Sequence, residues 1–404
     1  MPNPAAGVFK QIAYKKEVTY GLVPAAAAAQ ALRRVSSVID LSKDTYLSNE
    51  IKPSFQKSDF RHGVRRVKGK LQGDLACKTY SELFGFALKR DFAAIAAIAG
   101  ASITVAGAGP VYTITRAAGS FLTDGIKNGQ VVRLSVGTFA AANLNKNLLV
   151  TAVAALVLTV LVLNATALVA EGPIATSTVT VAGKTTFIPQ IGHTDNSFSY
   201  EHYFPELVQS EVYSGCKVNQ INLSLPPTGL AQIDIDITGQ QITTAAAQYF
   251  TSPTVITTTG ALAAVNGVLR VGGVTYAIVT GLTMTINPGF TGDPVVGSNL
   301  VPFQFPGSVM VSGQFTAYFI DTVLRDAFYN ETEIDLLAAF TADNTAAADF
   351  LALALPRIKV GSAGKTDGEG GLVQTFTFQA LEPLTGGAGF ATEKTTIMIQ
   401  DAQA

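Results

Sequence analysis

The sequence predicts an all-β protein with short helices. It divides into two tandem antiparallel units of sandwich or barrel type, with a small β-barrel or sandwich domain inserted into the first. Two observations carry this prediction. β-Branched residues alternate with polar ones along much of the chain, as in half-buried strands. A strand-and-helix pattern also recurs far apart in the sequence. With 404 residues, of which 48% are hydrophobic, the chain is long enough to bury a large core.

Residues 1–31 are expected to form an N-terminal arm. The opening segment MPNPAAGVFKQIAYKKEVTYG holds no apolar run of the length that a secretion signal needs, and the alanines at 25–29 are too few to supply one. We therefore expect a soluble chain without a secretion signal.

The first unit is predicted over residues 32–92 and 191–240. HGVRRVKGKLQGDL, from His62, reappears as PGSVMVSGQFTAYF from Pro306, with Gly63, Val67 and Gly69 each matched 244 positions later. Each copy alternates like a strand, and each leads into a short helix-like segment, TYSELFGFALKRDF or DTVLRDAFYNET. This duplication indicates two copies of one structural unit.

An insertion is predicted at residues 93–190. From Val67 to Leu230 is 163 positions, whereas the matching span from Val311 to Leu372 is 61, so the first copy holds 102 extra residues. The apolar run LLVTAVAALVLTVLVL at 148–163 is too short to span a bilayer, and we interpret it as two buried strands joined through the alanines at 154 and 155. Five or six short strands of this kind suit a compact β-domain.

Residues 241–261 are expected to be a linker, and residues 262–404 the second unit. This unit holds the strand LTMTI, the repeated strand and the second helix-like segment. Duplicated units of this kind fit an assembly with internal pseudo-symmetry, such as a ring.

Charge is distributed unevenly along the chain. Residues 1–90 carry 16 Lys and Arg against 7 Asp and Glu, which leaves 12 against 22 for the remainder. Only 14% of the chain is charged, yet residues 40–70 hold twelve charged side chains. The two cysteines, Cys77 and Cys216, are too few for a disulfide framework or a cysteine metal site and are expected to be buried thiols.

Catalytic and cofactor motifs are weak. HTDNSFSYEHYF holds His193, Asp195, Glu201 and His202, but their spacing matches no zinc motif, and AGAGP lacks the rest of a dinucleotide fingerprint. Phosphate-loop, nucleophile-elbow and HExxH motifs do not occur. We predict no enzyme activity, no cofactor and no metal.

Asp234 and Asp236 alternate with isoleucines in QIDIDIT, which places both carboxylates on one face of a strand. Paired carboxylates can perform acid–base catalysis, but no histidine or further acid accompanies them. A solvated acidic face is the preferred interpretation.

The stretch RHGVRRVKGK is basic enough to raise nucleic-acid binding. However, few aromatic residues interleave with its charges, and Asp44, Glu50 and Asp59 lie just upstream. Mixed signs favour a contact with another protein over a phosphate track.

Residues 32–92 closely resemble the N-terminal unit of tail tube, or major tail, proteins of long-tailed bacteriophages (siphoviruses). CKVNQINLSLPPTG, AAVNGVLRVGG, TGDPVVGSN and ATEKTTIMIQD extend the resemblance over most of the chain. It implies tube-type units whose copies close into rings, which stack around a channel for genome ejection. It also implies a structural virion protein of the tail, assembled in the host cytoplasm. The inserted domain is then expected on the outside.

The resemblance also implies partners and sites. The partners are copies of the chain itself, in trimeric pseudo-hexameric rings or alternatively hexamers, the tape measure protein, and tail terminator or baseplate proteins. DNA passes transiently and no membrane is involved. Asp234 and Asp236 are candidates for the lumen, although their counterparts Thr375 and Thr377 are neutral. The expected contact is the charged loop (residues 43–61), whose counterpart is the neutral loop (residues 288–306). Its candidate interface residues are Asp44, Tyr46, Glu50, Lys52, Phe55, Lys57, Asp59, Arg61, Arg65 and Arg66.

Two other classes fit the composition. A virion decoration or adhesin-like β-protein needs no duplicated unit. A glycan hydrolase needs activity from Asp234, Asp236 or the histidine cluster.

Overall fold

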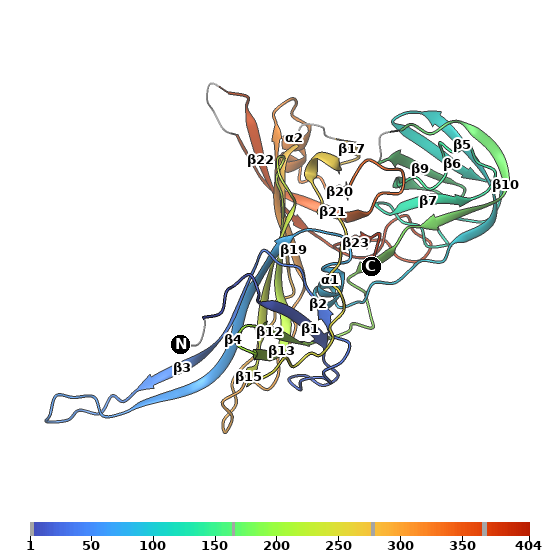
Figure 1. Cartoon of the computed structure of the whole chain (residues 1–404). Coiled ribbons are helices and arrows are strands. Elements are labelled where there is room, and N and C mark those ends of the chain that lie inside the picture. The colour runs from blue at the N-terminus through green and yellow to red at the C-terminus, as the bar shows by residue number, and fades with distance from the viewer. Residues whose placement is uncertain (1–3, 164–165, 276–278, 366–369) are drawn as a thin grey trace.

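The computed structural model describes residues 4–163, 166–275, 279–365 and 370–404. The predicted all-β class is confirmed, because antiparallel strands make up the body and the α-helices of the described residues are short: α1 (Ser81–Leu88) and α2 (Val323–Tyr329). A 3-10 turn covers Ala264–Asn266. In Figure 1 a long β3–β4 hairpin leaves one side of this body, and a separate barrel stands at the other.

One continuous antiparallel sheet, which we call the arc sheet, forms one layer of the body. Its strands pair in the order β3-β4-β14-β13-β18-β19-β22-β21. Their bounds are β3 (Ser36–Leu47), β4 (Phe60–Asp74), β14 (Gln232–Gly239), β13 (Gln209–Leu225), β18 (Val279–Asn287), β19 (Met310–Tyr318), β22 (Val373–Ala380) and β21 (Phe350–Lys365).

A second layer, the cover strands, closes the core. The first halves of β13 and β21 leave the arc sheet and pair with these strands, so each long strand belongs to both layers. Ile235 of the arc sheet and Tyr200 of the cover are both fully buried in the core between the layers. The cover strands are β1 (Gln11–Lys16), β12 (Phe198–Phe204), β15 (Gln241–Ala245), β16 (Gly267–Val271), β20 (Ile334–Thr341) and β23 (Met398–Asp401). Short strands β2 (Gln30–Ala31), β11 (Lys184–Phe187) and β17 (Val274–Thr275) complete the body.

The pairing registers repeat between two sets of strands. The first strand set is β1, β3, β4, β12, β13, β14 and β15 with α1; the second is β16, β18, β19, β20, β21, β22 and β23 with α2. Five strands of the first set each keep one sequence offset to their counterparts: 245 for β3, 244 for β4, 141 for β14, 142 for β13 and 136 for β12. The pairs that fix these offsets are Ile39–Gly69 with Met284–Gly313, Leu71–Ile235 with Phe315–Phe376, Val218–Ile237 with Val360–Phe378, and Phe198–Cys216 with Ile334–Ile358.

Even an irregularity of the ladder is duplicated. β13 shifts register between Val218 and Gln220, and β21 shifts between Val360 and Ser362, at the same offset of 142. Such bulges bend a strand, which is what both strands need in order to cross from one layer to the other. The repeat in the sequence is therefore a repeat in three dimensions.

Six strands within the predicted insertion form a closed barrel in the order β10-β5-β6-β9-β8-β7. The apolar run at 148–163 forms two strands, as predicted, and the barrel has its own core. Among the described residues, none of the helices is long and apolar enough to cross a membrane. The bounds are β5 (Ile98–Ala108), β6 (Val111–Arg116), β7 (Val131–Val136), β8 (Leu148–Val153), β9 (Val157–Val162) and β10 (Glu171–Val181).

The barrel is packed against the second strand set. Alternate residues of β21 face opposite sides, so Leu351 and Leu353 enter the main core while Phe350 and Ala352 pack with Val131 of the barrel. The side chain of Gln400, on β23, accepts a hydrogen bond from Val131 N (2.7 Å) and donates to Val131 O (2.9 Å) and Ala182 O (2.6 Å). The barrel therefore lies on the outer face of the cover strands, away from the arc sheet.

Two expected boundaries contain regular structure. The expected N-terminal arm holds β1, which pairs with β12 from Gln11–Tyr203 to Lys16–Phe198, because Ile12 and Tyr14 enter the core. The expected linker begins with β15, which pairs with β13. Both segments are part of the cover layer.

Candidate subunit interface

The charged loop is the tip of the hairpin formed by β3 and β4. The strands pair from Ser36–Gln72 to Leu47–Phe60, with one register shift between Lys43 and Thr45, so the ladder continues far beyond the core. This hairpin projects away from the rest of the molecule in Figure 1. Near its tip Ile51 and Phe55 are fully exposed. Both side chains are therefore free to contact another molecule.

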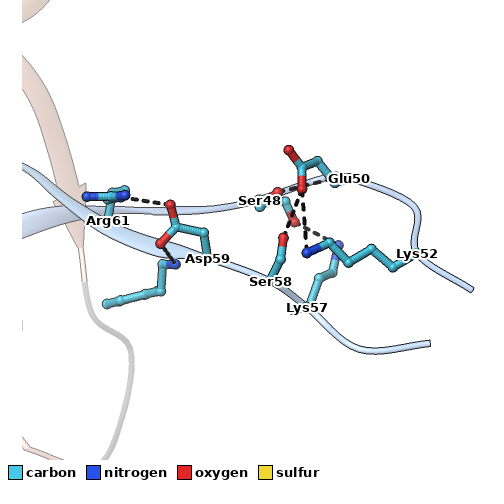
Figure 2. Close-up of polar contacts among 8 residues, drawn as sticks. Ser48, Glu50, Lys52, Lys57, Ser58, Asp59 and Arg61 are labelled. Atoms are coloured by element: carbon cyan, nitrogen blue, oxygen red, sulfur yellow. Dashed lines mark hydrogen bonds and ion pairs between the residues drawn. The ribbon is translucent and has the colours of Figure 1, made fainter. Parts of the chain in front are cut away.

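The charges at the tip pair with one another. Asp59 and Arg61 form an ion pair at 2.7 Å, and Glu50 accepts a hydrogen bond from Ser58 at 3.0 Å and lies 3.9 Å from Lys52 (Figure 2). The ammonium of Lys57 donates to the carbonyl of Ser48 at 3.1 Å. Exposed pairs of this kind add little to stability, so they shape the tip more than they hold the fold together.

The base of the hairpin carries the other predicted residues. Arg66 donates to both oxygens of Asp44, at 3.0 and 3.1 Å. Tyr46 lies over Gly63, where a Cβ would meet the ring at 2.3 Å. The backbone N–H of Arg65 donates to the carbonyl of Asn299, 2.8 Å away in the neutral loop. The structure thus gathers the predicted residues along one hairpin. The neutral loop lies against the base of that hairpin, where it is joined by a backbone hydrogen bond at Arg65.

The neutral loop starts like the charged loop but folds back onto the first strand set. Its base pair Thr291–Phe305 is joined by two backbone hydrogen bonds and matches Tyr46–Arg61 at the strand offsets of 245 and 244. Beyond this pair the loop turns inward, and Val301 is 5% exposed. Gln240 donates to its carbonyl at 2.9 Å. Two loops with the same base therefore have different surroundings.

Two edges of the arc sheet lack a partner strand within the described residues. β3 pairs with β4 on one side only. The second half of β21 pairs with β22 on one side only, whereas the matching half of β13 pairs with β14 and also with β18. Unpaired edges are sites where another strand can add. Sequence reasoning missed them, because it located the strands without their pairing.

The face of the arc sheet opposite the core is polar and nearly neutral. One row of paired residues crosses seven strands with no apolar member: Ser36, Gln72, Asp234, Asn222, Thr285, Ser312 and Gln379. Asp234 and Asp236 share this face, as their alternation predicts, with Lys70 at 3.5 and 3.8 Å from their carboxylates. The predicted pair therefore carries its own counter-charge.

A family model for phage tail tube proteins matches residues 10–380, which is nearly the whole chain. The chain belongs to the phage tail tube protein family. No curated protein matches it significantly. As a tail tube protein it is a structural component of the virion tail, and its family implies that it assembles with copies of itself into a tube.

The histidine-containing segment of this tail tube protein is built into the fold. His202 is 3% exposed, with its Nε2 2.9 Å from the hydroxyl of Ser37. Burial, and then the charges of Lys10 and Arg34, lower the pKa of His202 to about 3, so the ring is neutral. Glu201 accepts hydrogen bonds from two backbone N–H groups, and Asp195 pairs with Lys217. In the part of the chain that the structure describes, no three His, Cys, Asp or Glu residues are placed to hold a metal.

Cys77 and Cys216 of the tail tube protein are buried free thiols, as predicted. Burial raises the pKa of both, which keeps them protonated and unreactive.

Proposed function

We propose that copies of this chain close into rings by pairing β3 of one copy with the second half of β21 in the next, and that the rings stack into the tail tube. The observation that carries this proposal is the antiparallel pairing of β13 with β18, which joins the two strand sets inside one chain. β21 is the counterpart of β13 and β3 is the counterpart of β18. The two free edges are therefore the two halves of a joint that the chain already makes once.

The internal joint also predicts the register of the external one. Inside the chain Ile221 pairs with Ile286 and Asn222 with Thr285. With offsets of 142 for β13 and 245 for β18, the equivalent pairs are Ala363 with Leu41, and Gly364 with Asp40, of the next copy. Backbone hydrogen bonds supply most of the affinity in such strand addition.

Three copies in a ring account best for the duplication. Each chain contributes two strand sets, so three chains supply the six units of a pseudo-hexameric ring. A hexamer of whole chains remains the alternative arrangement. The polar face of the arc sheet then lines the channel, with Asp234 and Asp236 among its lining residues. Hydroxyl and amide groups, and carboxylates beside Lys70, offer passing DNA few positive groups to adhere to.

The barrel is placed outside by this arrangement, because it packs on the outer face of the cover strands. The tube serves as a conduit for genome ejection. Tape measure protein occupies it before ejection, and terminator and baseplate proteins bind its ends. The chain assembles in the host cytoplasm and acts without catalysis, cofactor or metal.

Negative-stain electron microscopy of the purified protein tests the proposal directly. Rings or tubes with a central channel are expected. Monomers under every condition of concentration, salt and temperature would contradict it. A decoration or adhesin-like protein would give isolated particles, and a glycan hydrolase would cleave glycans in a manner lost on Asp234→Asn or Asp236→Asn.

A further inference from the structure

An ion pair recurs in the two strand sets with very different exposure. Lys217 and Asp195 are joined at 2.6 Å in the first set, and Lys359 and Glu331 at 3.4 Å in the second. Lys359 follows Lys217 by 142 positions, the offset of β13 to β21. Glu331 follows Asp195 by 136, the offset of β12 to β20, and each acid lies three positions before its strand begins.

The neutral loop covers the first of these pairs. The ammonium of Lys217 donates to the carbonyl of Gln304 at 3.0 Å and lies 4.9 Å from the ring of Phe290. The ring of Tyr20 also lies 5.3 Å from this ammonium. The side chain of Lys217 is 4% exposed as a result, whereas that of Asp195 is 49% exposed. In the second set the side chain of Lys359 is 40% exposed and that of Glu331 is 81% exposed. The second pair lacks the cover that its counterpart has.

We propose that the charged loop of the neighbouring copy covers the Lys359–Glu331 pair, as the neutral loop covers Lys217–Asp195 within the chain. This inference rests on the proposed ring, because β3 of the neighbour must pair with β21 to bring its loop there. The loop bases correspond, so Phe60 takes the place of Gln304 and Thr45 the place of Phe290.

The different chemistry of the two loops follows from this arrangement. The surface under the charged loop holds further ion pairs, Arg357 with Glu333 and Lys394 with Glu382. An apolar loop would remove water from these ion pairs without supplying polar partners in exchange, whereas a charged loop can supply them. The neutral loop is joined to its own chain, and in the first set the uncharged Gly215 and Ser197 stand at the positions of Arg357 and Glu333.

Protection of Lys359 from acylation tests this contact. Ring-forming protein and dilute monomer are treated with an N-hydroxysuccinimide acetate, and each lysine is followed by mass spectrometry. The reactivity of Lys359 is expected to fall at least about tenfold on assembly. The exposed Lys184 on β11 is the internal control and is expected to change little.

Cross-linking identifies what covers Lys359. The chain carrying Phe60→Cys and Lys359→Cys, both at exposed positions, is expected to give covalent dimers and trimers with a short bis-maleimide. The pair Glu206→Cys and Lys359→Cys is the matched control and is expected to remain monomeric. Cys77 and Cys216 are buried and do not interfere.

Rings in which Lys359 stays reactive, or in which both cysteine pairs cross-link equally, would overturn this inference while leaving the proposed function standing. Absence of rings in the unmodified chain would overturn both.

Discussion

The ammonium of Lys70 lies 3.5 Å from the carboxylate of Asp234, its cross-strand diagonal neighbour on the polar face of the arc sheet. The same ammonium serves Asp236 at 3.8 Å. Because one cation lies between two anions, this part of the face carries a net charge of one negative unit.

Replacing both carboxylates tests the part they play in the channel. Asp234→Asn with Asp236→Asn leaves Lys70 unmatched on the face proposed to line the lumen. We expect tubes that retain DNA, with a retention that falls as salt rises, because each uncompensated cation adds a phosphate contact. Stability should change by less than about 1 kcal/mol, since these pairs are partly exposed. Gel retardation of short DNA by tubes is the measurement.

The control for this change is Asp293→Asn, which removes a carboxylate from the neutral loop. It is expected to leave DNA retention unchanged. Equal retention by both variants would show that Asp234 and Asp236 do not face the DNA.

Proline at the free edge of β21 tests ring closure. Successive residues of a strand direct their N–H groups to opposite sides, so one of Ala363 and Gly364 offers its N–H to the free edge. Proline there is expected to abolish rings while leaving the folded monomer, because only the external ladder loses a donor. Proline at the other position is expected to destabilise the β21–β22 pairing. Electron microscopy and thermal unfolding separate the two effects, and rings from both variants would refute the joint.

Charge reversal in the charged loop tests its contact role. Lys57→Glu with Arg61→Glu and Arg65→Glu should impair the assembly of rings and tubes while leaving the fold intact, since these side chains are outside the core. Sedimentation velocity follows assembly, and circular dichroism follows folding. The conservative exchange Lys57→Arg, Arg61→Lys and Arg65→Lys keeps the charge and should assemble normally. Normal tubes from the reversed chain would remove the loop from the interface.

Gln400→Ala tests how firmly the barrel is held. The change removes a buried amide and leaves Val131 and Ala182 with unmatched backbone groups. A loss of about 1–3 kcal/mol in the free energy of unfolding is expected by chemical denaturation. The nearby Gln403→Ala is the matched control, because Gln403 bonds to Asp349 at the surface. A loss no larger than that control's would contradict the anchoring role of Gln400.

His202 predicts a dependence of stability on pH. Its pKa is about 3 in the folded chain, below its ordinary value of 6.5, so the unfolded chain binds the proton more readily. The contribution of the neutral His202 to the free energy of unfolding is therefore present above about pH 6.5 and is lost as the pH drops toward 3. The expected loss is about 2 kcal/mol between pH 7 and pH 5. His202→Gln should remove this component. Urea unfolding of both chains at several pH values checks it, and identical pH profiles would contradict it.

Much of the fold could be predicted from the sequence, because the patterns that indicate it, strand alternation and a repeated segment, are local or occur twice. Alternation placed Asp234 and Asp236 on one face, and the spacing of the two repeats predicted an insertion over the range in which the barrel strands lie. Asp195 also lies in a segment whose titratable groups resemble a possible metal site. What it pairs with, Lys217, lies 22 positions away on another strand, and that contact depends on strand register.

The proposed interface was only partly predictable. The charge density of residues 40–70 marks the hairpin, but nothing in the neutral loop indicates that Gln304 and Val301 contact the first strand set through backbone carbonyls. Such contacts place little demand on the side chain and leave little trace in sequence. The exposed Lys359 becomes informative only beside its buried counterpart.

Each chain has one barrel for its two strand sets. Among the described contacts, Gln400 and its neighbours hold this barrel against the second set alone. A tube of trimers would then have an outline of three ridges around a bore of sixfold character. A protein that surrounds such a tube would meet three equivalent barrels per ring, separated by three surfaces without a barrel. An assembly that contacts all three barrels in the same way would need threefold symmetry.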